Sequence, residues 1–202
     1  LPRRGGPAPS RGPRPGELPQ LPGRPAAGQV RLGLPGPERG GLPALGRPPA
    51  QLRGPAAGAA SFMDCVGIHY NSGAVPPSAT SGAPVGSSGH YSWYYSSMVN
   101  IYRARFPGIP LCFTEIGYVT SEGFSTGLPP GFEWGAGNTV QEQAQWLAAA
   151  AVQARNSGAV RLFIVWNVDS QNYGADPQAG YAIVRPDGNC PSCNTLGSAI
   201  GG

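Results

Sequence analysis

Three short apolar segments, separated by two segments of helical length, constrain the fold of this chain more than any other feature. The apolar segments are residues 62–70, 110–117 and 161–168. Each is typical of a buried β-strand, because apolar and β-branched residues fill it and Pro, Gly or polar residues bound it. Helices are predicted over about 90–105 and from Thr139 to Gly158. This order of strand, helix, strand, helix, strand predicts parallel strands joined by right-handed crossovers, and therefore an α/β fold.

The second helix carries the clearest start and stop signals. Thr139 and Glu142 have the spacing of a capping box, in which each side chain accepts a hydrogen bond from a free backbone N–H group. Gly158 is a natural terminator, because glycine readily adopts the left-handed conformation that ends helices. One face of the predicted helix is apolar and should pack on the sheet; it consists of Val140, Ala144, Leu147 and Ala151.

The composition of the N-terminal part excludes it from this fold. The first 60 residues use nine residue types and include no aromatic residue, and Pro, Gly, Ala and Arg supply 45 of them. Such a segment cannot bury enough apolar surface to offset its ordering entropy. We therefore predict a disordered tail over residues 1–55 and a folded part over residues 56–202. Nine of the 14 Arg residues lie in the tail, so the net charge of +4 describes the tail rather than the folded part.

The composition of the tail has two interpretations. Its four dominant residues have codons that begin with two G or C bases, which is the output expected when GC-rich coding DNA is translated out of frame. The rival is a basic arm that binds nucleic acid, suggested by Arg4-Gly5-Gly6 and Arg39-Gly40-Gly41. That rival lacks the interleaved aromatic residues that stack on bases, so we favour the out-of-frame hypothesis.

The chain starts at Leu1 without a signal peptide, which leaves the compartment unassigned, and we expect an incomplete N-terminus. No apolar run approaches the length of a membrane span.

Glu115 is the strongest candidate for a catalytic residue. Residues 111–114 lead directly to this carboxylate, and Gly117 follows it. In a parallel α/β barrel, the C-terminal tips of the strands are where active sites lie. The structural alternative is a carboxylate that caps a turn or pairs with an arginine.

The three predicted strands resemble a known family. Asp64–Tyr70, Phe113–Gly117 and Phe163–Asn167 resemble the last three strands of clan A retaining glycoside hydrolases, in particular family 39-like and cellulase-like members. Gly180–Gly188 is similar to the segment that leads into the last helix of that barrel. The resemblance implies a partial (β/α)8 barrel with strands equivalent to 6–8. It also implies an O-glycosyl hydrolase that acts on a β-linked oligo- or polysaccharide by double displacement, without a metal or organic cofactor.

The resemblance also implies roles for single residues. Glu115 would be the nucleophile that forms a glycosyl-enzyme intermediate, and Trp166 would form a floor under the sugar ring. His69 and Tyr70 would hydrogen-bond the sugar or hold the nucleophile carboxylate. Further sugar contacts would come from Tyr118, Phe132, Trp134 and Asn167. The alternative for the aromatic residues and for His69 is ordinary packing in the core or in a satellite cluster.

The main departure from the family is a missing carboxylate. Retaining glycosidases need a second acid about 5–5.5 Å from the nucleophile to protonate the leaving group. In clan A it is the Glu of an Asn-Glu-Pro motif on an earlier strand, and this chain has neither that motif nor the earlier strands. We therefore expect the chain to be inactive alone. Because the missing strands leave a sheet edge open, we also expect it to be prone to aggregate or only partly ordered. A non-catalytic carbohydrate-binding or structural barrel protein remains the alternative.

The sequence predicts different roles for the two pairs of cysteines. Cys190-Pro-Ser-Cys193 is a single Cys-x-x-Cys pair, whereas a structural zinc site usually needs four ligands. A local disulfide fits an exported protein, and a redox motif at the start of a helix is the alternative. Cys65 and Cys112 lie within predicted strands and are expected to act as small apolar residues.

Overall fold

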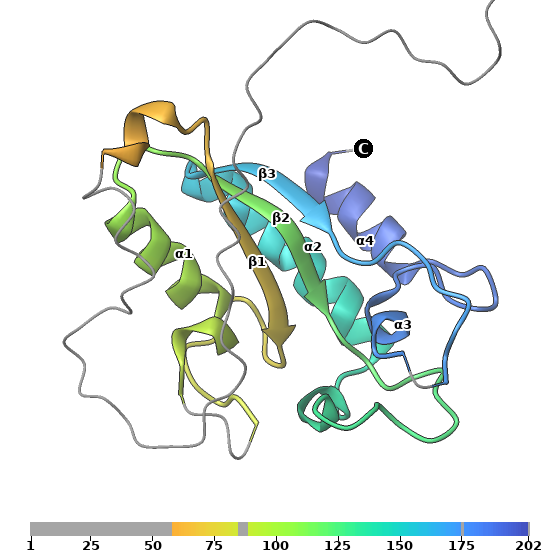
Figure 1. Cartoon of the computed structure of the whole chain (residues 1–202). Coiled ribbons are helices and arrows are strands. Elements are labelled where there is room, and N and C mark those ends of the chain that lie inside the picture. Colours follow the sequence, from red (N-terminus) through yellow and green to blue (C-terminus); the bar gives the residue numbers. More distant parts are fainter. Residues whose placement is uncertain (1–57, 85–88, 175, 202) are drawn as a thin grey trace, which may run out of the picture. The chain divides into compact units, whose positions relative to one another are not determined.

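The computed structural model describes residues 58–84, 89–174 and 176–201. These residues form an α/β unit on a three-stranded parallel sheet with the strand order β1-β2-β3 (Figure 1). The predicted alternation of strands and helices is confirmed, whereas the predictions for residues 1–55 lie outside the described residues. The main elements are β1 (Val66–Gly73), α1 (Tyr95–Arg105), β2 (Leu111–Tyr118), α2 (Val140–Ser157), β3 (Val160–Val165), α3 (Gln178–Tyr181) and α4 (Pro191–Ile200).

Several boundaries differ from the sequence prediction. The first strand begins at Val66 rather than at residue 62, because Ala59–Phe62 forms the 3-10 helix η3. The first α-helix begins at Tyr95, because the preceding residues Tyr91–Trp93 form a second 3-10 helix, η4. A third 3-10 helix, η5 (Glu133–Gly135), lies in the long connection between β2 and α2. In the first two cases a short 3-10 turn replaces residues that were predicted as part of a longer strand or helix.

The predicted signals at both ends of α2 are confirmed. The backbone N–H of Thr139 donates to Glu142 Oε2 over 2.9 Å, and the backbone N–H of Glu142 donates to Thr139 Oγ1 over 3.1 Å. Gly158 ends the helix with a φ of 61°. Gln143 is a departure from the predicted apolar face, because this polar side chain is fully buried. It donates hydrogen bonds through Nε2 to the carbonyl oxygens of Tyr118 and Gly180, over 2.7 and 3.1 Å.

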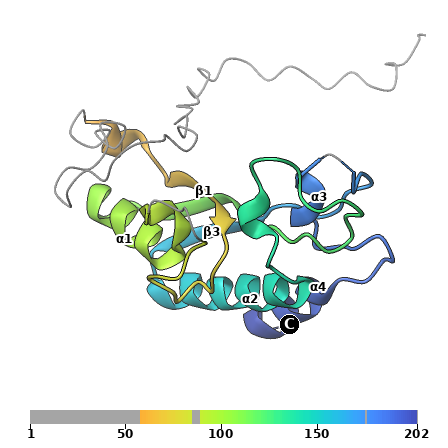
Figure 2. The same cartoon turned by 90° about the horizontal axis from the view of Figure 1, so that it is seen from below.

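Helices α1 and α2 pack on the same face of the sheet. On β1 this face carries every second residue, namely Val66, Ile68 and Tyr70, all of them buried. Tyr95 of α1 stacks on Phe113 of β2 with a ring-centroid distance of 5.3 Å, and its hydroxyl donates to the carbonyl of Ala150 in α2. Figure 2 shows α4 beside α2, on the side of α2 away from the strands. The hydrophobic core therefore lies between the sheet and these helices.

The opposite face of the sheet is not covered by any described element. On β3, Leu162 and Ile164 are 42% and 45% exposed, which is unusual for apolar residues of a short parallel strand. Within the described residues, β1 and β3 each pair with β2 alone, so both outer edges of the sheet are free. The aggregation of the chain stays a prediction. If the chain aggregates, we expect the contacts to form through this exposed apolar face and these free strand edges.

Cys65 and Cys112 form a disulfide, so the expectation that they act as free apolar residues is wrong. The pairing of β1 with β2 explains the bond. Val66 lies opposite Leu111 and Gly67 opposite Cys112, which places Cys65 within a Cα–Cα distance of 5.9 Å from Cys112. Cys190 and Cys193 form a second disulfide, which agrees with a local structural bond and equally with an oxidised redox motif.

Among the described helices, none combines the length and the apolar character that a membrane span requires.

Candidate functional site

An irregularity in β2 turns Glu115 toward the open face of the sheet. Ile68 pairs with Phe113, but the next residue, His69, pairs with Glu115, so β2 contains one residue more than its partner. Such a β-bulge breaks the alternation of side chains and re-aims those that follow. Phe113 is buried, Thr114 is exposed, Glu115 is half-buried and Ile116 is buried again. Strict alternation would have directed Glu115 into the core with Phe113.

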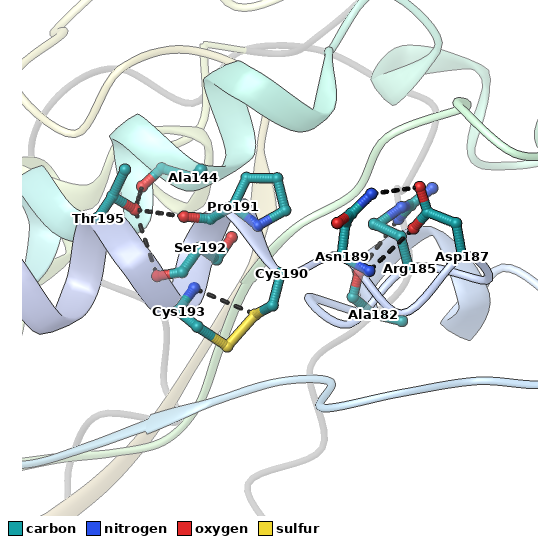
Figure 3. The surroundings of a disulfide bond; sticks show 10 residues. All are labelled: Ala144, Ala182, Arg185, Asp187, Asn189, Cys190, Pro191, Ser192, Cys193 and Thr195. Atoms are coloured by element: carbon teal, nitrogen blue, oxygen red, sulfur yellow. Dashed lines mark hydrogen bonds between the residues drawn. A yellow bond between two sulfur atoms is a disulfide. The ribbon is translucent and has the colours of Figure 1, made fainter.

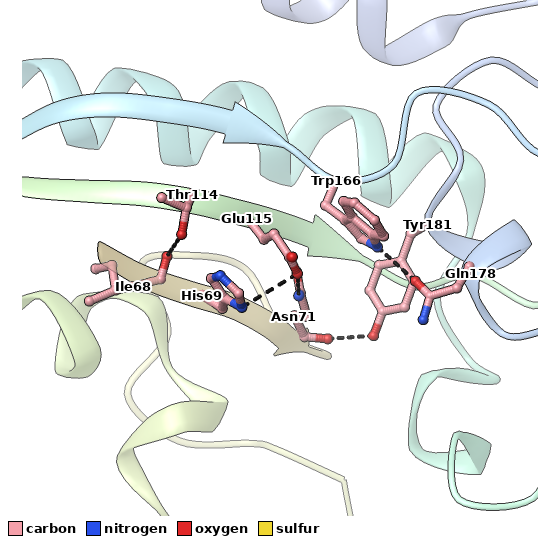
Figure 4. Close-up of polar contacts among 8 residues, drawn as sticks. All are labelled: Ile68, His69, Asn71, Thr114, Glu115, Trp166, Gln178 and Tyr181. Atoms are coloured by element: carbon pink, nitrogen blue, oxygen red, sulfur yellow. Dashed lines mark hydrogen bonds and ion pairs between the residues drawn. The ribbon is translucent and has the colours of Figure 1, made fainter. Parts of the chain in front are cut away.

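Two side chains of β1 meet the Glu115 carboxylate (Figure 4). Asn71 Nδ2 donates a hydrogen bond of 2.9 Å to Glu115 Oε2. His69 Nδ1 lies 3.5 Å from the same oxygen, with side-chain exposures of 47% for His69 and 29% for Glu115. Both β1 residues lie on the open face, because they alternate with the buried Ile68 and Tyr70. Glu115 Oε1 makes no hydrogen bond within the described part of the chain, so one carboxylate oxygen is oriented and the other is left available.

Tyr181 supports this contact from a distant part of the sequence. Its hydroxyl donates to the backbone carbonyl of Asn71 over 2.6 Å, across a separation of 110 residues. Burial and the nearby negative charge of Glu115 raise the pKa of Tyr181, so the phenol remains protonated and acts as a donor at neutral pH. Tyr181 therefore fixes the backbone of the residue that orients Glu115.

Trp166 borders the site from the end of β3 (Figure 4). Its backbone N–H donates to the carbonyl of Ile116, and its indole Nε1 donates to Gln178 Oε1 over 2.7 Å. The Trp166–Asn167 peptide bond is cis. Asn167 is held through its backbone, which donates to the carbonyl of Tyr181 and accepts from the N–H of Ile183. The structure thus brings Trp166 and Asn167 next to the residues that surround Glu115.

Gly117 allows this close approach. A Cβ atom at this position would lie 2.2 Å from the carbonyl oxygen of Trp166 and 2.8 Å from the ring of Tyr181. The predicted glycine after the acid is therefore required by packing between β2 and the end of β3, rather than by a turn, since β2 continues to Tyr118.

Tyr70 and Tyr118 are not brought to the site. Both are fully buried on the helix-covered face, where their rings make an edge-to-face contact at 5.7 Å. Tyr70 donates through its hydroxyl to the carbonyl of Trp93, and burial raises the pKa of both phenols. The structure therefore places them in the packing role that was the alternative for the aromatic residues.

The aromatic residues of the long loop form a separate group with a residue that the sequence analysis did not select. Trp134 in η5 meets Trp93 in η4 edge-to-face at 5.3 Å, and Phe132 lies 6.2 Å from the Trp134 ring. The helix η4 follows β1 and η5 follows β2 in the chain, whereas Glu115 lies within β2, three residues before its C-terminal end. The half-buried rings form an aromatic surface at this end of the sheet.

No other described carboxylate contacts Glu115. Glu133 accepts from the N–H of Gly131, and Glu142 belongs to the capping box of α2. The alternative of an arginine partner for Glu115 is not met by the described residues either. The buried Arg185 instead donates to the carbonyls of Ala182 and Glu122 and lies over the ring of Tyr173 at 5.2 Å. Across residues 58–84, 89–174 and 176–201, no three His, Cys, Asp or Glu side chains gather in a way that could hold a metal ion.

Asn71, Tyr181, Gln178 and Trp93 are the residues of this region that the sequence analysis missed. The alternation of side chains along β1 could have predicted Asn71 as a site residue, because it lies two positions after His69 on the same face of a strand that continues to Gly73. Tyr181 and Gln178 carry no such signal, since they lie in the short helix α3, more than 60 residues after Glu115.

Comparison of the chain with protein-family models, with curated proteins and with solved structures gives no match.

Proposed function

We propose that this chain is the C-terminal part of a retaining O-glycosyl hydrolase barrel, in which Glu115 is the nucleophile and the substrate is a β-linked oligo- or polysaccharide. The observation that carries the proposal is the position and hydrogen bonding of the Glu115 carboxylate. It lies on the open face of a parallel sheet, with Oε2 held by Asn71 at 2.9 Å and with Oε1 free of protein partners in the described residues.

This arrangement suits nucleophilic attack on a sugar. A carboxylate nucleophile must present one oxygen to the anomeric carbon while its orientation is fixed. Asn71 and His69 contact the other oxygen, and both lie on the neighbouring strand. The half-buried indole of Trp166 beside the carboxylate would suit the apolar C–H face of a pyranose ring.

The barrel assignment has its own support. The two crossovers place both helices on one face of the sheet, and the other face exposes apolar side chains of β3. In a closed (β/α)8 barrel that inner face would be covered by side chains of the remaining strands. Leu162 and Ile164 would then be interior residues of the complete barrel.

A covalent trapping experiment tests the nucleophile without the missing acid. A 2-deoxy-2-fluoro glycoside with a dinitrophenolate leaving group needs no protonation of the leaving group, and its fluorine slows hydrolysis of the intermediate. We expect the full chain to gain the mass of one fluorosugar from a member of a gluco, galacto, manno and xylo panel. Peptide mapping should locate the sugar on Glu115.

Matched variants make the result specific. Glu115→Gln should abolish labelling, whereas Glu122→Gln and Glu133→Gln, which alter exposed carboxylates, should leave it unchanged. Hydrolysis of ordinary aryl glycosides should stay negligible, because the loss of general acid catalysis costs about 10²–10⁴-fold in rate. A label on another carboxylate would refute the assigned nucleophile.

The aromatic surface favours a second candidate, a non-catalytic carbohydrate-binding protein. Trp93, Trp134 and Phe132 provide half-buried rings without any contribution from Glu115. Glycan binding that survives Glu115→Gln but is lost in Trp134→Ala, together with no trapping by any fluorosugar, would favour this candidate over the hydrolase.

A further inference from the structure

The disulfide between Cys190 and Cys193 spans the first turn of α4 (Figure 3). We propose that this disulfide is a site of reversible thiol–disulfide exchange with low-molecular-weight thiols. The inference is independent of the proposed hydrolase, since neither cysteine contacts the residues around Glu115.

The two sulfur atoms differ in access. Cys193 is exposed, whereas Cys190 is half-buried. An incoming thiolate must approach a disulfide sulfur directly, so access decides which sulfur is attacked. We therefore expect attack at the Sγ of Cys193, the more exposed of the two residues, with the Sγ of Cys190 as the leaving group.

The leaving group lies in an environment that stabilises negative charge. Cys190 is the N-cap residue of α4, and its Sγ accepts a hydrogen bond of 3.1 Å from the backbone N–H of Cys193. Pro191 occupies the first turn, where its fixed backbone geometry suits the start of a helix. A thiolate at this position would keep that hydrogen bond and would face the positive end of the helix dipole, an environment that favours reactive cysteines.

Reduction need not release the helix. Thr195 Oγ1 donates to the carbonyl of Ala144 in α2 over 2.8 Å, so α4 is held to its neighbour by a contact that does not involve sulfur. The exchange can therefore proceed on the folded protein, with Cys190 still acting as the N-cap of α4.

The chain contains an internal reference for this reactivity. The Cys65–Cys112 disulfide joins two strands across a sequence separation of 47, against a separation of 3 for Cys190–Cys193. Cys112 is only 3% exposed, and Cys65 precedes a strand rather than a helix. This disulfide therefore lacks both features of the Cys190–Cys193 bond: an exposed cysteine for the incoming thiolate to attack, and a leaving-group cysteine at the N-terminus of a helix.

The exchange balances in two steps. A thiolate attacks Cys193 Sγ, the Cys190–Cys193 bond breaks, and its electron pair leaves on Cys190 Sγ, which gives a mixed disulfide on Cys193. A second thiolate attacks the external sulfur of that mixed disulfide and releases Cys193 as a thiolate. The two external thiols become one disulfide, their two protons pass to the cysteines, and the protein disulfide gains two electrons. The reverse reaction reoxidises the pair.

The test is a reduction time course of the full chain with glutathione. Acid quenching, thiol alkylation and peptide mass spectrometry would follow each disulfide separately. We expect Cys190–Cys193 to be reduced roughly tenfold faster or more than Cys65–Cys112. The trapped glutathione adduct should lie on Cys193. A parallel time course in concentrated urea should remove the difference, because the exposure of Cys193 and the helix N-terminus depend on the fold.

Three results would overturn the inference: equal or slower reduction of Cys190–Cys193 than of Cys65–Cys112, an adduct on Cys190, or the same selectivity in urea as in native buffer. The Cys190→Ser variant provides a second reading. It lacks the resolving thiolate, so oxidised glutathione should form a stable adduct on Cys193; failure to form that adduct would also count against the exchange site.

Discussion

Asn71 on β1 donates a hydrogen bond of 2.9 Å to Glu115 on β2, and Tyr181 holds the backbone of Asn71 through a second hydrogen bond of 2.6 Å. This chain of two contacts connects the carboxylate with a residue that follows the last strand. Asn71 and Tyr181 therefore orient Glu115, and their contribution can be tested by variants that leave Glu115 itself unchanged.

Asn71→Ala should slow fluorosugar trapping at Glu115. The substitution removes the hydrogen bond that fixes Oε2, and small errors in the placement of a nucleophile cost about 10–100-fold in rate. Tyr181→Phe removes only the hydroxyl that holds Asn71, so its effect should be smaller than that of Asn71→Ala. The initial rate of dinitrophenolate release measures both. Unchanged trapping in Asn71→Ala would show that Asn71 does not orient the carboxylate.

Gly117→Ala should destabilise the chain by about 1–3 kcal/mol, the usual cost of overpacking a tight site. The added methyl group would overlap the carbonyl oxygen of Trp166, which is a backbone atom and cannot rotate away. Gly67→Ala is the matched control on β1, because the nearest atom to its Cβ would be a side-chain atom of Thr114 at 3.8 Å. Urea unfolding at low protein concentration compares the two. Similar unfolding midpoints for both variants would contradict the close approach.

Gln143→Leu should lower the free energy of unfolding by about 1–3 kcal/mol, although it places an apolar side chain in the core. The substitution leaves the buried carbonyl of Tyr118 without the donor Nε2, and an unpaired buried polar group costs about that amount. Gln145→Leu on the exposed face of α2 is the control and should change stability by less than about 0.5 kcal/mol. The unfolding midpoints of the two variants in urea test this prediction. A Gln143→Leu variant that is more stable than the unmodified chain would contradict it.

Removal of the two disulfides should have unequal effects on stability. In the loop-entropy model, replacement of Cys65 and Cys112 by Ser costs about 4 kcal/mol, because the bond closes a loop across a sequence separation of 47. Replacement of Cys190 and Cys193 by Ser costs about 2 kcal/mol, because its separation is 3. Urea unfolding of the two double variants gives the comparison. The opposite order would show that native-state contacts, rather than loop closure, dominate.

His90 should make the chain less stable as the pH falls. Partial desolvation of the largely exposed His90 ring lowers its pKa below its usual value, and the neutral ring accepts a hydrogen bond at Nδ1 from the N–H of Ser92. The unfolded state therefore binds the proton more readily than the folded state. The stabilisation is present above the ordinary histidine pKa of about 6.5 and is lost as the pH falls through the lower folded value.

The His69→Gln background isolates this effect, because the chain has two histidines. Proton NMR should give a titration midpoint for His90 below that of a histidine in a model peptide. The double variant His69→Gln, His90→Gln should lose the corresponding pH dependence of unfolding. A midpoint at or above the model-peptide value would contradict the prediction.

The order of elements, the ends of α2 and the position of Glu115 after an apolar run could be predicted from the sequence alone. These features are local: a capping box, a terminal glycine and a strand-like run depend on residues within a few positions of one another. The short spacing of Cys190 and Cys193 likewise allowed a local disulfide, which the structure contains.

The face that each strand residue occupies, and the contacts between residues far apart in the sequence, could not be predicted in this way. The bulge after Phe113 has no sequence signal, yet it directs Glu115 away from the core while Tyr70 and Tyr118 remain within it. The pairing of Cys65 with Cys112 required the register of two parallel strands. The contact of Tyr181 with Asn71 spans 110 residues, and such contacts follow from the packing of the whole chain rather than from any local preference of the sequence.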